Sequence, residues 1–128
     1  MSYNFTKVVS MSYEEALEKV PAELGKEGFG VLTEVDVTGT LKKKLGVDFR
    51  RYRILGACNP AFAHKAFQAE GRIGVLLPCG VAVQEWEDGR VEVSAVNPME
   101  TMKAVGNPNL EPIAREVSAC LQAVIARL

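Results

Sequence analysis

Residues 81–96 read VAVQEWEDGRVEVSAV, and this stretch decides the fold. Apolar residues at positions 91, 93 and 95 alternate with polar residues at 92 and 94, which is the pattern of a half-buried strand. Asp88-Gly89 lies between two apolar runs and predicts a two-residue type I′ hairpin turn. We therefore predict antiparallel strands over 73–86, bent at Pro78, and over 90–96.

The N-terminal part of the chain predicts a strand followed by a helix. Residues 3–10, YNFTKVVS, are rich in the aromatic and β-branched residues of strands. Ser12 and Glu15 have the spacing of a capping box, so the helix begins at Ser12. Pro21 removes a helix hydrogen bond and should kink or split that helix, and Gly28 is placed to end it.

The rest of the chain continues to alternate strands with helices. Residues 30–38 place Val31, Thr33, Val35 and Val37 on one face, which predicts a half-buried strand. The dipeptide Asn-Pro is typical of a helix start, and it occurs at 59–60, 97–98 and 107–108. The other predicted elements are a helix over 41–45 closed by Gly46, a strand over 49–58, a helix over 60–68, a helical turn over 99–105 and a final helix between 113 and 128. The order β-α-β-α-β-α-β-β-α predicts an α+β fold, with helices packed on one face of a mostly antiparallel sheet.

Composition is that of one ordinary globular domain, which we place over residues 1–128. The chain has a formal net charge of -1, 48% hydrophobic residues and 24% charged residues. No apolar run approaches the ~18–20 residues of a membrane span, and residues 1–10 lack the pattern of a secretion signal. We therefore expect a cytoplasmic protein with no membrane partner. Three cysteines, Cys58, Cys79 and Cys120, do not suggest a disulfide framework.

Three stretches carry a family resemblance: KEGFGVLTEVDV (26–37) with the KKKLG that follows, YRILGACNPAFAHKAF (52–67) and IGVLLPCGVAVQEW (73–86). They resemble the bacterial and archaeal family known as domain of unknown function 302, over roughly residues 4 to 127. The resemblance implies a TATA-binding-protein-like α+β fold and a homodimer, and it implies no established activity. Gly80 stands where the family pattern often has Asn, so we assign no side-chain role at that position.

Cys58, Asn59 and His64 form one candidate site. Cys58 directly precedes the Asn59-Pro60 helix start, where free backbone amides and the helix dipole stabilise a thiolate or a bound anion. His64 lies about one turn further along this helix and could approach the sulfur, and a Cys–His pair is an activated nucleophile. The alternative is structural: Cys58 shares strand parity with Tyr52 and Ile54, which suggests the core face, and His64 could be a surface residue.

Cys79 extends this candidate site if strands 49–58 and 73–86 are neighbours. Cys79 has the parity of Val81 and Val83. Cys58, His64 and Cys79 would together offer three soft ligands, although their spacing matches no metal motif. The sequence assigns neither a metal nor another cofactor.

Arg51 and Arg53 are candidates for binding an anion. They lie in a basic block, residues 39–53, in which six basic residues face one acidic residue for a net charge of +5. Two guanidinium groups on one strand face could grip a phosphate or carboxylate. The alternative is a set of cross-strand ion pairs with Glu34 and Asp36. The near-neutral total charge argues against a nucleic-acid partner.

Two functions remain open on the sequence alone. The first is a homodimeric binding module with a pocket for a small molecule or ion near Cys58, Asn59, His64 and Cys79. The second is a thiol-dependent enzyme or redox sensor that uses Cys58 with His64. A single His and the lack of a nucleotide-binding motif favour the binding module.

Overall fold

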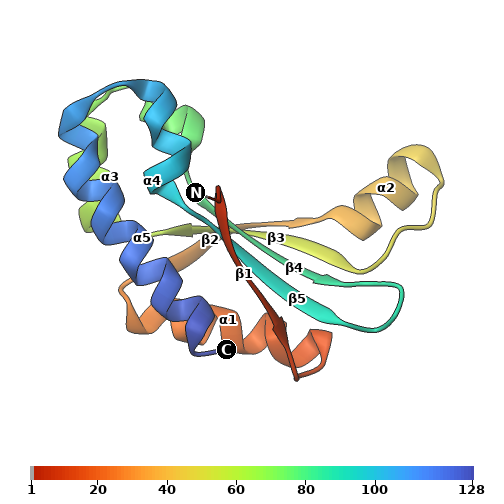
Figure 1. The fold of residues 1–128 in the computed structure, drawn as a ribbon. Helices are drawn as coiled ribbons and strands as arrows, with labels where there is room; N and C mark the ends of the chain where they lie inside the picture. Colours follow the sequence, from red (N-terminus) through yellow and green to blue (C-terminus); the bar gives the residue numbers. More distant parts are fainter. Residues whose placement is uncertain (1) are drawn as a thin grey trace.

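A computed structural model describes residues 2–128 and confirms the predicted α+β fold (Figure 1). Five antiparallel strands form one sheet in the order β1-β5-β4-β3-β2. The elements are β1 (Asn4–Val9), α1 (Tyr13–Lys26), β2 (Gly30–Asp36), α2 (Val37–Leu45), β3 (Tyr52–Cys58), α3 (Pro60–Ala69), the 3-10 helix η1 (Ile73–Leu76), β4 (Cys79–Glu85), β5 (Val91–Val96), α4 (Pro98–Thr101), the 3-10 helices η2 (Met102–Val105) and η3 (Pro108–Leu110), and α5 (Glu111–Ala126).

The core lies between one face of the sheet and the helices α1 and α5. Leu55 and Ala57 of β3, Val81 and Val83 of β4, and Val93 of β5 are all buried there. Alternate residues of a strand point to opposite faces, so these strands supply one apolar layer to the helices. The capping box predicted at the start of α1 is present, and α1 continues past Pro21 without splitting in two.

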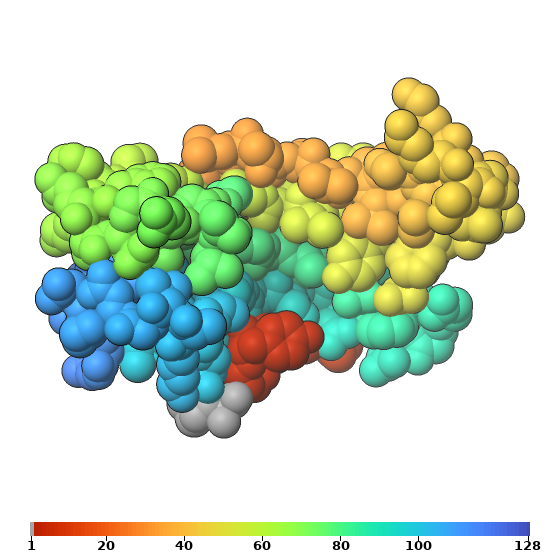
Figure 2. Space-filling view, turned by 90° about the horizontal axis from the view of Figure 1, so that it is seen from above, coloured from red at the N-terminus to blue at the C-terminus, as the bar shows by residue number. Residues whose placement is uncertain are grey.

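The opposite face of the sheet is open. In Figure 2, which looks onto this face, β4 and β5 form a floor that is set back between β2 on one side and β1 on the other. Its central positions are small, since Gly56 of β3 pairs directly with Gly80 of β4 and Ala82 follows on the same face. Ile54 is 38% exposed here.

Two predictions about strand faces were wrong, and the register explains both. A bulge between Val31 and Thr33 inserts one residue into β2, so Val31 pairs with Ala57 on the core side while Val35 pairs with Ile54 on the open side. The strand therefore does not keep one half-buried face. Cys58 shares parity with Ile54, as predicted, but that parity belongs to the open face and not to the core.

The hairpin and the segment before β4 also differ from prediction. Gly89 has φ +90°, while no residue other than glycine has a positive φ among residues 2–128. The Gly89 amide donates to the Trp86 carbonyl, so the turn is a type I turn followed by a left-handed glycine and not type I′. Residues 73–76 form a 3-10 helix, and β4 begins only after Pro78, whose ring cannot donate to a sheet ladder.

The short helices at residues 98–110 and the helix α2 also depart from prediction. Residues 98–105 form two pieces, α4 and η2, instead of one turn over 99–105. Helix α2 begins four residues earlier than predicted because the Asp36 carboxylate accepts a hydrogen bond from the Gly39 amide and caps it. None of residues 37–45 is buried, so α2 extends away from the sheet (Figure 1).

Gly56 marks the closest packing on the open face, and its replacement tests the register. A Cβ at Gly56 would lie 2.7 Å from Pro78 Cγ and would also collide with the Thr33 side chain. We expect Gly56→Ala to lower the free energy of unfolding by ~1–3 kcal/mol, which is the range for overpacking. Urea denaturation measures this change.

Gly80→Ala is the matched control for this experiment. Gly80 is the direct cross-strand partner of Gly56, and a Cβ at Gly80 would have no neighbouring atom of residues 2–128 within 4 Å. We expect an effect close to zero for this variant. Equal destabilisation by the two alanines would contradict the packing described for Gly56.

Candidate functional site

A cavity of about 290 Å³ lies at the end of the sheet where β3 finishes and β4 begins. Its walls come from the loop before β2, from β2 and β3, from α3 and η1, and from α4, η2 and α5. The lining residues are Phe29, Leu32, Thr33, Ala57, Cys58, Asn59, Phe62, Ala63, Ala66, Phe67, Gly74, Leu77, Pro78, Cys79, Pro98, Met102, Ile113, Ala114 and Val117. Nearly all of the side-chain atoms that face the cavity are carbon atoms, so the cavity is apolar.

Depth divides the cavity into a sealed floor and an exposed mouth. Ala57, Ala66 and Cys79 are buried at the floor. At the mouth, Leu32 is 68% exposed and Phe67 is 48% exposed. Large apolar side chains that border both a cavity and solvent are typical of a ligand-binding site.

Asn59 holds α3 in place beside the cavity. Its Oδ1 accepts hydrogen bonds from the amides of Ala61 at 3.2 Å and Phe62 at 3.4 Å. Its Nδ2 donates to the Glu27 carbonyl at 3.2 Å and lies so close to Gly28 that a Cβ there would be 2.9 Å away. Gly28 also has φ +81°, so this approach requires glycine.

The amides at the start of α3 are therefore not free for an anion. Pro60 has no N–H, Asn59 Oδ1 accepts from the next two amides, and the Ala63 amide donates to the Asn59 carbonyl. The expectation that this helix start offers unpaired amides to a ligand was wrong, because the preceding asparagine caps them. Asn59 therefore has a structural role at the border of the cavity, where it joins α3 to the loop after α1.

Cys58 and Cys79 line the same cavity. Cys79 pairs with Ala57, the neighbour of Cys58, so the adjacent strands bring the two cysteines to one end of the sheet. Cys58 is partly buried and Cys79 is 7% exposed. Burial, and to a smaller extent the nearby Cys58, raise the pKa of the Cys79 thiol to about 11. Cys79 is therefore a neutral thiol at neutral pH.

His64 does not line the cavity that the two cysteines share. It is exposed on α3 and is not among the described residues that line the cavity. Residues 2–128 contain no group of three or more His, Cys, Asp and Glu side chains that could hold a metal ion. The structure thus brings Cys58, Asn59 and Cys79 together and leaves His64 outside.

Arg51 and Arg53 lie at the other end of β3 and are paired within the chain. Arg51 binds Glu85 with Nη2–Oε2 at 2.9 Å and also binds Glu14, while Arg53 binds Glu34. The carboxylate of Glu85, followed by that of Glu14, raises the pKa of Arg51 above its ordinary value. The predicted ion pair with Glu34 is confirmed, and neither guanidinium is placed as an open anion site.

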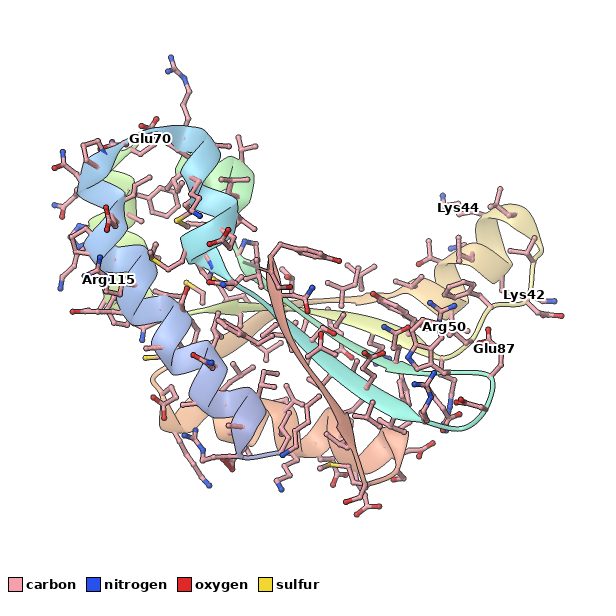
Figure 3. The ribbon with its side chains drawn as sticks, viewed as in Figure 1. Lys42, Lys44, Arg50, Glu70, Glu87 and Arg115 are labelled. Carbon is pink, nitrogen blue, oxygen red and sulfur yellow. The ribbon has the colours of Figure 1, made fainter. Side chains whose placement is uncertain are left out.

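A cluster around Arg50 occupies the same end of the sheet. The Arg50 guanidinium lies 4.5 Å from the ring centre of Phe49 and 4.1 Å from that of Trp86, and its Nε donates to Gln84. Figure 3 shows Arg50 and Glu87 at this end, far from Glu70 and Arg115 at the cavity end. This cation–π cluster stabilises the open face where no helix covers it.

Several lining residues were missed by the sequence reasoning. The residues that α3 contributes, Phe62, Ala63, Ala66 and Phe67, form a stripe with helical spacing. That stripe predicts a buried helix face, and only the exposed fraction of Phe67 distinguishes a cavity wall from a core. Phe29, Met102 and Val117 come from distant segments and carry no local signal.

Comparison with known proteins identifies the family. Residues 5–128 match the sequence profile described as "Domain of unknown function DUF302". The chain belongs to the DUF302 family. An uncharacterized protein of Aquifex aeolicus (strain VF5) is 30% identical over 111 residues, which cover 84% of this chain and 74% of that protein.

A solved DUF302 structure also agrees with the fold. It is the crystal structure of an uncharacterized conserved DUF302 protein from Bacillus stearothermophilus, with a TM-score of 0.92 and 30% identity. The match covers 99% of this chain and 98% of that chain. None of the helices between residues 2 and 128 is long and apolar enough to cross a membrane.

The Cys79 thiol predicts a pH dependence of stability. Its pKa is about 11 in the folded chain against an ordinary value of 9.0, so the folded state holds this proton more tightly than the unfolded state. The resulting contribution to stability is complete below pH 9.0 and is lost as the pH rises toward about 11. We expect the urea midpoint to fall with pH across this window more steeply for the wild type than for Cys79→Ala. Identical slopes for the two proteins would show that the thiol is not buried as described.

Proposed function

We propose that this DUF302 protein is a small homodimeric binding module and that its ligand is a small apolar molecule held in the cavity at the end of the sheet. The single observation that carries the proposal is the apolar lining of this cavity. A volume of about 290 Å³ is roughly twice the ~150 Å³ of an engineered apolar cavity that binds benzene. A fused aromatic molecule of two or three rings or an alkyl chain of similar volume therefore fits.

The polar groups that line the cavity support a ligand whose buried part is uncharged. Asn59 is engaged at both ends of its amide, and the Cys79 thiol is neutral. A buried charge or an unpaired polar group on a ligand would find no partner at the floor and would be disfavoured. The gain on binding comes from removing apolar surface from water on both molecules.

The thiol-dependent alternative has less support. The amides at the start of α3, beside Cys58, already donate to Asn59, and the neighbouring Cys79 thiol has a raised pKa where an activated thiolate needs a lowered one. His64, the base proposed from the sequence, is exposed and does not line the cavity.

Filling the cavity tests the proposed ligand. Ala63 lines the cavity on α3, so Ala63→Phe would place a ring inside it. As a probe we choose 1-aminoanthracene, whose fluorescence increases in apolar surroundings. We expect saturable binding by the wild type and a loss in affinity of about tenfold or more in Ala63→Phe, because overpacking costs ~1–3 kcal/mol. Fluorescence titration measures both affinities.

Ala61→Phe is the matched control, since Ala61 lies on the same helix, is exposed and does not line the cavity. This variant should bind the probe as the wild type does. Absence of saturable binding by the wild type, or equal binding by Ala63→Phe, would refute an apolar ligand site. Circular dichroism confirms that both variants are folded.

The homodimer is supported by exposed apolar residues along one arm of the molecule. β2 is an edge strand, and the segment from β2 to β3 exposes Val35, Leu45, Val47 and Phe49. Exposed edge strands with apolar residues favour pairing with another chain. A nine-residue helix without buried residues, such as α2, gains stability mainly from packing, which a second copy can provide.

Light scattering tests this dimer. We expect a solution mass of twice the 13.9 kDa chain, and we expect Val35→Lys to reduce it to that of the monomer, because a charge on the edge strand opposes pairing. Val75→Lys is the matched control: Val75 is 86% exposed on η1, outside the arm from β2 to β3. A monomeric wild type, or a dimer that persists in Val35→Lys, would count against this interface.

A further inference from the structure

A second hollow adjoins the cavity on the side of α4 and η2. Its volume is about 400 Å³. Three residues, Pro98, Met102 and Ala114, line both the cavity and this second hollow. These three side chains therefore separate the two spaces, and we call them the partition.

The second hollow differs from the cavity in chemistry. Its lining includes Lys103, Asn107 and Glu111 together with apolar residues such as Met99 and Leu110. Lys103 is ion-paired with Glu100 at 3.0 Å, and the Asn107 amide donates to the Ala69 carbonyl at 2.8 Å. The two spaces together thus run from a purely apolar floor to a region of mixed polarity.

Met102 is the most adaptable of the three side chains in the partition. Pro98 has a rigid ring and is fully buried, and Ala114 is buried with only a methyl group. Met102 is partly exposed and has an unbranched side chain with several rotatable bonds, which adapts readily to irregular spaces. It lies at the junction of α4 and η2, each only four residues long, where few helix hydrogen bonds constrain the backbone.

We propose that the ligand is a single-chain amphipath whose alkyl chain lies in the apolar cavity and passes Met102, so that its polar end lies in the second hollow. This inference rests on the proposed function, because it requires that the cavity bind an apolar group. It adds the class of ligand: an unbranched chain with one polar end, which uses both spaces, instead of a compact ring system, which uses only the first.

The test is the dependence of affinity on chain length. Linear saturated carboxylates from hexanoate to palmitate compete with 1-aminoanthracene, and their dissociation constants are obtained by displacement. For the wild type we expect affinity to rise roughly three- to fourfold with each added methylene group, which is the increment for burying one methylene, and to continue rising through the longer members.

Two variants at the partition should act in opposite directions. Met102→Trp blocks the passage, so the carboxylates should lose more affinity than 1-aminoanthracene does, because their charged end can no longer reach the second hollow. Met102→Ala widens the passage, so the longest carboxylates should bind at least as tightly as to the wild type. Met99 lines the second hollow and not the first cavity, so Met99→Trp should weaken the carboxylates at least tenfold and leave the affinity for 1-aminoanthracene unchanged.

The outcomes separate the two proposals. If 1-aminoanthracene does not bind, the proposed function fails, and this inference fails with it. If the probe binds but no carboxylate displaces it, or if the carboxylates bind Met102→Trp and Met99→Trp as tightly as they bind the wild type, only this inference is overturned. Circular dichroism establishes that each variant is folded, and Met99→Trp keeps the test decisive if Met102→Trp does not fold.

Discussion

The cavity depends on one hydrogen-bonding arrangement that the chain uses three times. At each Asn-Pro sequence the asparagine Oδ1 caps the helical turn that follows, while its Nδ2 donates to a carbonyl in a distant segment. Asn59 thereby joins α3 to Glu27, Asn97 joins α4 to Ser2, and Asn107 joins η3 to Ala69. Helices of ten, four and three residues are too short to be stable alone, so these bonds and tertiary packing fix their positions.

These three short helices, together with α5, line the cavity and the adjoining second hollow at this end of the sheet. α3 contributes only one buried residue, Ala66, while its Phe62 packs partly buried against the core, so the helix covers the sheet end without filling it. Alanine and glycine at several lining positions keep the space open. Because protein interiors are normally packed to crystal-like density, an apolar space of this size that is bounded by small residues favours occupancy by a ligand.

The sequence predicted what local chemistry determines. The alternation in β5, the capping box of α1 and the Asn-Pro helix starts each depend on a few neighbouring residues, and each is present in the structure. The errors came from features decided by tertiary context. The extra residue in β2 reverses which side chains face the core, and nothing in GVLTEVD distinguishes a bulged strand from a regular one. The open face of β3 was likewise mistaken for the core, because Tyr52 and Ile54 are apolar but are covered by no helix.

The sequence predicted only those residues of the candidate site that local strand and helix patterns place together. Cys58 and Asn59 close β3 and open α3, and the register of β3 with β4 brings Cys79 to the same end, so a strand-end argument reaches all three residues. That argument attributed polar chemistry to them. In the structure these polar groups are not available to a ligand. The Asn59 amide is hydrogen-bonded to the loop after α1 and to the α3 amides. The Cys79 thiol keeps its proton because burial raises its pKa. Under the proposed function, this neutrality makes the floor of the cavity selective, since a charged group held there would lose its hydration without gaining a partner.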